Sequence, residues 1–266
     1  MRICLKLVVW AFACNFLVVS TACTPLKSQE PRKRAQIHYD IGIASLNRGD
    51  QRQALKEILR ALEYDEGLVE AHFALGLIYH AMERQELALR HYKRAIALRP
   101  KFSEVQNNLG ILHMDMGNYN EAIESFELAL EDILYPTPYL AEGNMGWAYF
   151  KQGESKKAIA HVLKSIEINK RFCRGYEWLV RIALAEEKPA IATSMHVRFE
   201  KYCLKDVLIT ENVSREYVRE LQYHFALAFL KQGEREKAQL EFKKCASNDP
   251  ESTFGQKCSS SVYVKQ

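Results

Sequence analysis

A recurring spacing of small residues constrains this chain more than any other feature of its sequence. Four glycines follow one another at intervals of 34, 34 and 36 residues: Gly42, Gly76, Gly110 and Gly146. An alanine follows each glycine by twelve positions: Ala54, Ala88, Ala122 and Ala158. A fixed period of this length indicates stacked copies of one supersecondary unit rather than a single irregular globule.

The stretches that share this frame include "FALGLIYHAMERQELALRHYKRAIALRP" and "NNLGILHMDMGNYNEAIESFELALED". They resemble tetratricopeptide repeats, and the match covers most of the chain beyond its amino-terminal segment. Each unit is then two antiparallel helices, and the small residues let the two backbones approach closely. Helical periodicity is visible inside a unit, since Ala88, Tyr92 and Ala95 fall on one face. Gly49 and Gly117 stand where a first helix must end and turn.

This frame predicts an all-α fold: a right-handed α-solenoid of about six tetratricopeptide hairpins with a C-terminal capping helix. A fifth unit has Val180 in the glycine position and a sixth has Ala226, 46 residues later, which implies an insertion of about twelve residues around "DVLITENVSREY". Pro136 and Pro138 predict a rigid elbow between the third and fourth units. The expected units are 35–68, 69–102, 103–138, 139–172, 173–206 and 219–252, followed by a cap at 253–266.

The first 22 residues have the pattern of an export signal. Arg2 and Lys6 precede an apolar run of about 13 residues, which is the length of a secretory h-region. A membrane-spanning helix would need about 20 residues. We therefore expect residues 1–22 to be a removable signal and not part of the fold.

The signal ends in "STAC", which resembles the bacterial lipobox, where the cysteine is diacylated and becomes the first residue of the mature chain. The resemblance implies lipidation of Cys23, followed by a polar tether over 23–34. Thr24 favours the outer membrane, because an aspartate there would suggest retention in the inner membrane. Ser20 stands where a lipobox usually has an aliphatic residue, so ordinary cleavage near Ala22, which would release a soluble protein, stays an alternative.

Of the seven cysteines, four lie beyond the signal and the lipidation site: Cys173, Cys203, Cys245 and Cys258. An even number suits an oxidising compartment, and four cysteines permit three pairings. In an antiparallel hairpin the start of the first helix lies beside the end of the second. This geometry favours disulfides between Cys173 and Cys203, within unit five, and between Cys245 and Cys258, which joins unit six to the cap.

The sequence has no constellation of catalytic residues. It contains no phosphate-binding glycine loop, His-Glu-x-x-His pair, nucleophile elbow or Cys-x-x-Cys. The eight histidines are scattered, and His38 and His72 share a frame position where a packing tryptophan is usual. The formal charge of +4 is too small and too evenly spread to indicate nucleic acid binding. We predict no enzyme, no cofactor, no metal ion and no nucleic acid partner.

Tetratricopeptide arrays bind partners in a groove lined by the first helix of each unit, and the resemblance carries this site to particular frame positions. Those positions hold Tyr39, Ile43, Leu46, Phe73, Leu77, His80, Asn107, Ile111, Met114, Trp147 and Phe150. So apolar a strip on a surface predicts an interaction site. The alternative is a frame shifted by one position, which would make these core residues. Only Arg174 and Arg181 are basic at such positions, which disfavours a chaperone-type carboxylate clamp.

Two stretches, "ALEDILYPTPYLAEGNMGWAYFKQG" and "INKRFCRGYEWL", are similar to type IV pilus pilotins of the PilF/PilW/Tgl family, and to the Tgl branch in particular. The resemblance implies a lipoprotein on the periplasmic face of the outer membrane, monomeric when free, with its partner site in the N-terminal repeats. It would bind secretin subunits and promote their localisation and multimerisation into the pilus pore, in support of twitching or social motility. The alternatives are a periplasmic repeat scaffold for another envelope assembly or export machine, and an enzyme that uses the groove as a substrate cradle.

Overall fold

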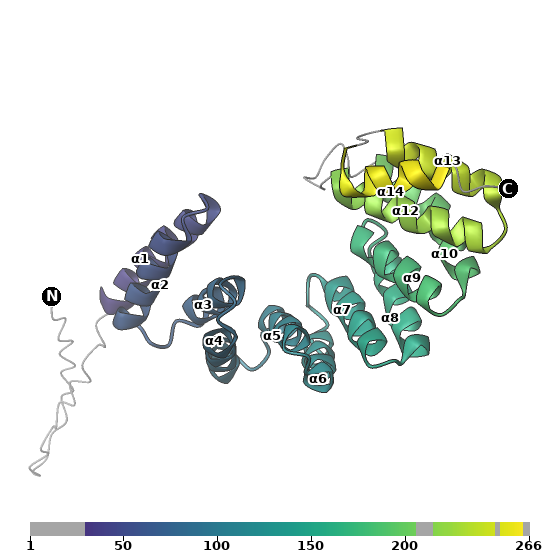
Figure 1. Cartoon of the computed structure of the whole chain (residues 1–266). Coiled ribbons are helices and arrows are strands. Elements are labelled where there is room, and N and C mark those ends of the chain that lie inside the picture. The colour runs from purple at the N-terminus through teal and green to yellow at the C-terminus, as the bar shows by residue number, and fades with distance from the viewer. Residues whose placement is uncertain (1–29, 206–214, 248–250, 263–266) are drawn as a thin grey trace, which may run out of the picture.

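The computed structural model describes residues 30–205, 215–247 and 251–262, and the regular structure of these residues is entirely helical. Antiparallel helix pairs follow one another along an open arc (Figure 1). The predicted all-α solenoid is therefore confirmed. The signal segment, Cys23 and the tether up to residue 29 lie outside the described residues. Among the helices that are described, none combines the length and the apolar character needed to cross a bilayer.

The helices pair in chain order. The first four pairs are α1 (Glu30–Asn47) with α2 (Gln51–Tyr64), α3 (Val69–Ala81) with α4 (Gln85–Leu98), α5 (Ser103–Asp115) with α6 (Tyr119–Leu130), and α7 (Pro138–Lys151) with α8 (Ser155–Ile168). The remainder are α9 (Cys173–Ala185) with α10 (Pro189–Phe199), the π-helical segment η1 (Glu200–Lys205), α12 (Arg215–Lys231) with α13 (Arg235–Ser247), and α14 (Thr253–Val262). Helix α14 packs against α12 and α13 and covers the C-terminal end of the stack.

The glycine frame has a direct steric cause. In each of the first four pairs a larger side chain, sixteen residues after the glycine, occupies the space that a glycine side chain would need. A Cβ at Gly110 would lie 2.5 Å from Phe126 Cε1, and one at Gly42 would lie 2.5 Å from Ile58 Cγ1. The small residue thus lets the first helix lie directly on the second, and both residues of each contact are buried.

The turn inside each hairpin uses the left-handed backbone region. Gly49 and Gly117 have φ values of 80° and 78°, as expected of residues that end a first helix. The second and fifth hairpins place Glu83 and Glu187 in the same conformation, with φ of 58° and 55°. A glutamate is strained there, so these two turns are less well suited to their sequence than the glycine turns.

The helix limits differ from the expected unit limits in two places. Helix α1 begins at Glu30, inside the segment expected to be tether, and the Glu30–Arg34 ion pair at 3.2 Å supports its first turn. Helix α12 begins at Arg215, so the end of the expected insertion is helical, while residues 206–214 lie outside the described part. The segment η1, which prolongs α10, had no counterpart in the sequence analysis. The division of 35–252 into six units stays a prediction.

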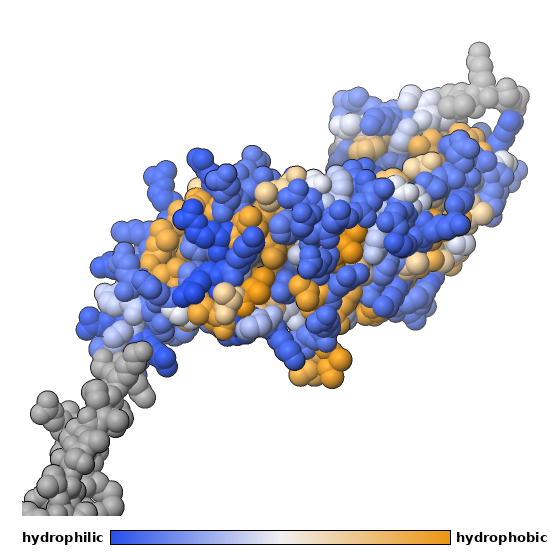
Figure 2. Space-filling view, turned by 90° about the horizontal axis from the view of Figure 1, so that it is seen from below, coloured by the Kyte–Doolittle hydropathy of each residue, from blue (hydrophilic) through white to orange (hydrophobic). Residues whose placement is uncertain are grey.

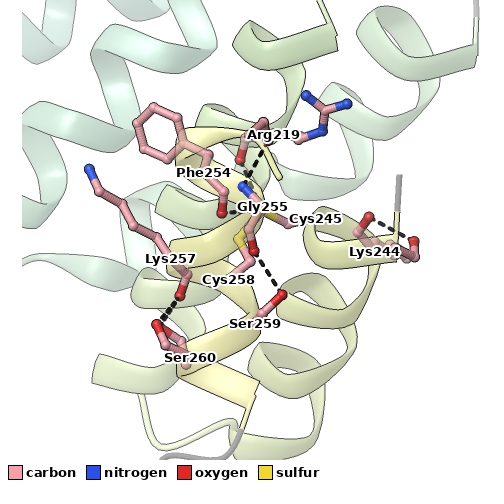
Figure 3. Close-up of a disulfide and its surroundings, with 12 residues drawn as sticks. Arg219, Lys244, Cys245, Phe254, Gly255, Lys257, Cys258, Ser259 and Ser260 are labelled. Carbon is pink, nitrogen blue, oxygen red and sulfur yellow. Dashed lines mark hydrogen bonds between the residues drawn. A yellow bond between two sulfur atoms is a disulfide. The ribbon is translucent and has the colours of Figure 1, made fainter. Parts of the chain in front are cut away.

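Two disulfides occur in the C-terminal region, and their pairings are those favoured by the hairpin argument. Cys173 and Cys203 join the start of α9 to η1, with Cα atoms 5.7 Å apart. Cys245 and Cys258 join α13 to the cap helix α14, with Cα atoms 5.9 Å apart. Figure 3 shows this second bond beside Phe254 and Arg219. The cap is therefore covalently attached to the last hairpin.

The connection between α6 and α7 presents an unusual pair of apolar side chains. The Asp132 carboxylate accepts hydrogen bonds from Ser103 Oγ at 2.7 Å and from the Leu134 amide at 2.9 Å. Tyr135 is buried, whereas Ile133 and Leu134 are 95% and 82% exposed. Pro138 begins α7, where its fixed φ suits the first turn. The predicted elbow is thus an ordered loop.

Candidate partner-binding surface

The first helices of successive hairpins line one side of the arc. Helices α3, α5, α7 and α9 contact one another in turn along the inner side, and α4, α6, α8 and α10 lie toward the outer side (Figure 1). The view from below the arc is predominantly hydrophilic, with apolar residues between the charged ones (Figure 2). Because the first helices line the inner side of the arc, they build the candidate site.

Most of the predicted groove residues are half-buried rather than freely exposed. Nine of the eleven fall in this class: Tyr39, Ile43, Leu46, Phe73, His80, Ile111, Met114, Trp147 and Phe150. Each apolar member also packs against a buried core cluster of its own or the neighbouring hairpin. Leu77 is more open, at 38% exposure. These side chains therefore serve the stacking of the first helices and leave only part of their surface for a partner.

Phe73 shows why the predicted groove residues are more buried than expected for a binding surface. Its ring centroid lies 5.4 Å from that of Phe102 and 6.3 Å from that of Tyr92. Tyr92 belongs to the same hairpin and Phe102 to the connection that follows it, so the ring fills the junction between two units. A frame position alone does not reveal this second neighbour.

Asn107 is the clearest departure from the predicted set. Its side chain is 4% exposed and its Oδ1 accepts a hydrogen bond from Asn144 Nδ2 at 3.1 Å. The bond joins α5 to α7, because the two residues are 37 positions apart on neighbouring first helices. Asn107 holds the inner row together and is too buried to contact a partner directly, which corrects its place in the groove.

A pocket lies beside Leu77, where α3 ends. Its volume is about 540 Å³, and it is lined by Leu77, His80, Ala81, Glu83, Gln85 and Asp115. His80 Nε2 lies 2.8 Å from Asp115 Oδ2, so α3 and α5 are tied together at its edge. The pocket is an open recess lined by both apolar and acidic residues. Such a recess suits a peptide side chain better than a cofactor, which needs a more enclosed site.

The remaining histidines of the first hairpins form polar pairs between the two helices of a unit. His38 Nδ1 lies 2.7 Å from Glu57 Oε2, and His72 Nδ1 lies 3.0 Å from His91 Nδ1. Burial lowers the pKa of His91 to about 4 and also lowers the pKa of His72. Both rings are therefore neutral at pH 7, and one donates to the other. These pairs fill the frame position where the sequence analysis expected a packing role.

Another polar cluster connects η1 to α13. Lys244 Nζ lies 2.7 Å from Glu200 Oε1 and 2.6 Å from Glu241 Oε1, and His196 Nε2 lies 3.3 Å from Glu241 Oε2. Burial alone would raise the pKa of Glu241, but its polar contacts with His196 and Lys244 outweigh burial and lower it. Lys244 supplies the positive charge that the two carboxylates need, so the cluster is a structural ion network.

Comparison with known proteins identifies the repeat. Tetratricopeptide repeat family models match residues 76–117, 102–171 and 220–252. The type IV pilus assembly protein PilF of Pseudomonas aeruginosa is 27% identical over 208 residues, which cover 78% of this chain and 71% of that protein.

Two solved structures have the same arrangement of helices. The crystal structure of PilW, described as a widely conserved type IV pilus biogenesis factor, superposes with a TM-score of 0.72 at 22% identity, covering 84% of this chain and 97% of that one. The structure of Pseudomonas aeruginosa PilF gives 0.67 at 21% identity, covering 87% and 99%. The chain is a PilF/PilW-like tetratricopeptide repeat protein. At these identities the two structures establish the fold and not the chemistry of the inner face.

In this PilF/PilW-like chain, Trp147 has three neighbours that were not among the predicted groove residues: Lys151, Trp178 and Arg181. Trp147 of α7 stacks on Trp178 of α9, and Lys151 and Arg181 lie over the Trp147 ring. One signal for this group is present in the sequence: Arg181 follows Trp147 by 34 residues, at the same position of the next unit. The frame can place two such residues side by side, but it does not show that their side chains touch.

Proposed function

We propose that this chain is an outer-membrane pilotin, which binds secretin subunits along the inner face of its solenoid and promotes their localisation and multimerisation into the type IV pilus pore. The role is in type IV pilus biogenesis and is non-enzymatic. The partner lies against the first helices, and the pore that results supports pilus-dependent motility.

One observation carries the proposal: half-buried apolar side chains recur on α1, α3, α5 and α7, the first helices of hairpins that follow one another along an arc (Figure 1). A curved surface of this kind offers a continuous apolar contact to one polypeptide segment. The relative named as a type IV pilus assembly protein supports the assignment to pilus biogenesis. Half-burial also has an energetic advantage, since side chains already held by packing lose less conformational entropy when a partner binds.

Anchoring belongs to the same proposal. Lipidation at Cys23 would attach the chain to the outer membrane, and residues 23–29 would separate the lipid from α1, which begins at Glu30. Stable anchoring needs more than one acyl chain, which a lipidated amino-terminal cysteine provides. Mass spectrometry of the mature amino terminus tests this part: a diacylated Cys23 is expected, and an unmodified terminus near Ala22 or Cys23 would contradict it.

Deletion of the gene tests the function. We expect secretin subunits to be made but to fail to form heat-resistant multimers in the outer membrane, and pilus-dependent motility to be lost. Normal multimers in the deletion strain would contradict the pilotin assignment. Normal multimers with defective assembly of a different envelope complex would favour the alternative scaffold.

Two matched leucines separate binding from folding. Leu77 on the inner face is 38% exposed and Leu128 on α6 of the outer side is 41% exposed. We expect Leu77→Asn to weaken secretin binding severalfold while Leu128→Asn leaves it unchanged, with the same helix content by circular dichroism in both. Equal binding by the two variants would exclude the inner face as the contact surface.

A further inference from the structure

An aromatic cluster fills the junction between the fourth and fifth hairpins, where Trp178 is buried and Trp147 is half-buried. The Trp147 and Trp178 rings stack with centroids 5.7 Å apart and an interplanar angle of 16°, and Phe172 meets Trp178 edge-on at 5.8 Å. A Cβ at Gly143 would lie 2.6 Å from Phe172 Cε1 and 3.0 Å from a ring atom of Trp178. The absence of a side chain on α7 at this point therefore makes room for the cluster.

Three cations surround these rings. The Arg181 guanidinium lies 5.2 Å and Lys151 Nζ 5.4 Å from the centre of the Trp147 ring, and the Arg174 guanidinium lies 5.9 Å from that of Trp178. All three side chains are exposed, and Arg181 also pairs with Glu177 Oε1 at 2.9 Å. Among the described residues, no carboxylate pairs with Lys151 or Arg174. The indole faces hold the cations in place and leave their outer sides open to a ligand.

Three of the six corresponding positions of the second and third hairpins have the opposite charge, and the other three are uncharged. Glu70 and Glu104 match Arg174 in the frame, and Asp115 matches Lys151. Glu70 pairs with Arg99, which partly neutralises its charge, and Asp115 Oδ2 lies 2.8 Å from His80 Nε2. The inner face is therefore apolar with acidic margins at α3 and α5, and aromatic with basic margins at α7 and α9.

We propose that Lys151, Arg174 and Arg181 form a subsite for acidic side chains of the same polypeptide whose apolar stretch lies on α1, α3 and α5. The inference rests on the proposed function and assigns the chemistry of the bound segment: its carboxylates lie at α7 and α9, and its apolar residues lie at α1, α3 and α5. Carboxylates beside cations on an indole surface form charge-assisted hydrogen bonds and are steered there before contact.

The tryptophans supply the assay. The full sequence has three, Trp10, Trp147 and Trp178, and a chain that starts at Cys23 lacks Trp10, so its fluorescence comes from the stacked pair alone. The probes are three synthetic peptides with one leucine-rich stretch followed by four glutamates, four glutamines or four lysines. We expect the glutamate peptide to change the fluorescence, the glutamine peptide to bind about tenfold more weakly, and the lysine peptide to give no binding.

The outcomes separate the inference from the function. Equal binding of all three peptides would overturn the acidic subsite and leave the apolar contact intact. If none of the three peptides binds, both the acidic subsite and the apolar contact are overturned. Tighter binding of a single-stranded oligonucleotide than of the glutamate peptide would also overturn the assignment, because stacked aromatics beside cations can bind nucleic acid bases.

A charge-matched pair of double variants completes the test. Lys151→Gln with Arg174→Gln removes two exposed inner cations, and Arg60→Gln with Lys156→Gln removes two exposed cations from α2 and α8. We expect the inner double variant to bind the glutamate peptide about tenfold more weakly and with a smaller dependence on salt. The outer double variant should bind it as the parent chain does. Equal affinities and equal salt dependence in the two double variants would contradict the subsite.

Discussion

The first three hairpins and the last two are stabilised by different interactions. In α1 to α6 each glycine of the frame is covered by a large side chain of its own hairpin, as Gly110 is by Phe126. In α9 to α14 the same frame positions hold Val180 and Ala226, both fully buried, and two disulfides and an ion network connect the elements. Regular stacking thus suffices where the repeat is regular, and covalent links occur where the π-helical segment and the insertion interrupt it.

This difference is testable because a repeat array has no single cooperative core. Its stability is approximately a sum of unit and neighbour contributions, so one end can be perturbed with little effect on the other. Hydrogen exchange followed helix by helix can distinguish the two regions.

The largest expected effect comes from the cap. Replacing Cys245 and Cys258 together by alanine should lower the free energy of unfolding of the C-terminal region by about 3 kcal/mol, because the unfolded chain regains the freedom of its closed loop. Amide exchange in α13 and α14 should accelerate while that in α1 to α6 stays the same. Uniform acceleration in all helices would contradict the division into two regions.

A smaller loss is expected from overfilling the glycine frame. Gly110→Ala would bring a methyl group to 2.5 Å from Phe126 Cε1 and should cost about 2 kcal/mol, measured by denaturant unfolding. Gly67→Ala is the matched control, since the only atom within 4 Å of its Cβ would be the flexible Asp65 carboxylate at 3.2 Å. A loss at Gly67 as large as that at Gly110 would mean that the frame glycines are not required for close packing.

Acidification should destabilise the second hairpin, where His91 lies. The folded chain holds the pKa of His91 near 4, mainly by burial, below its unfolded value of about 6.5. The unfolded state therefore binds the proton first, and stability falls as the pH decreases from about 6.5 to about 4, by about 1 kcal/mol at pH 5 after allowance for solvent screening. The Glu241 network, with its lowered pKa, should be lost only below about pH 4.5.

Amide exchange rates at pH 7 and pH 5 measure this loss of stability in α3 and α4. His91→Gln should flatten the pH dependence of α3 and α4 without changing that of α13. The same pH dependence of α3 and α4 in the parent chain and in His91→Gln would contradict the assigned burial of His91.

The smallest effect concerns the turns. Glu83 has a φ of 58°, a conformation that favours glycine, so Glu83→Gly should raise stability by about 0.5 kcal/mol. Glu86→Gly, within the first turn of α4, should instead lower it by about 1 kcal/mol. Thermal unfolding of the two variants compares them, and a loss at both positions would show that the Glu83 turn is not strained.

The solenoid could be predicted from sequence because its packing depends on local spacing. In each of the first four hairpins the frame glycine lies against the large residue sixteen positions later, as Gly42 lies against Ile58. The spacing in the sequence therefore already specifies this contact. The disulfide pairings follow from the same antiparallel geometry, since Cys173 and Cys203 lie at adjoining ends of one hairpin.

The inner face could be predicted only in outline. Frame positions identify which side chains point inward, but their burial depends on neighbouring units, as the contact of Phe73 with Phe102 and the hydrogen bond of Asn107 show. The stacking of Trp178 on Trp147 is likewise a contact between units. The π-helical segment η1 escapes prediction because its backbone pattern carries no distinct hydrophobic period.

Hydrogen exchange of the full chain with and without purified secretin subunits tests the central claim most directly. The account predicts slower exchange on binding in the first helices α1, α3, α5 and α7, with α4, α6 and α8 unchanged. Protection confined to the outer helices, in a complex shown to form, would contradict an inner-face contact.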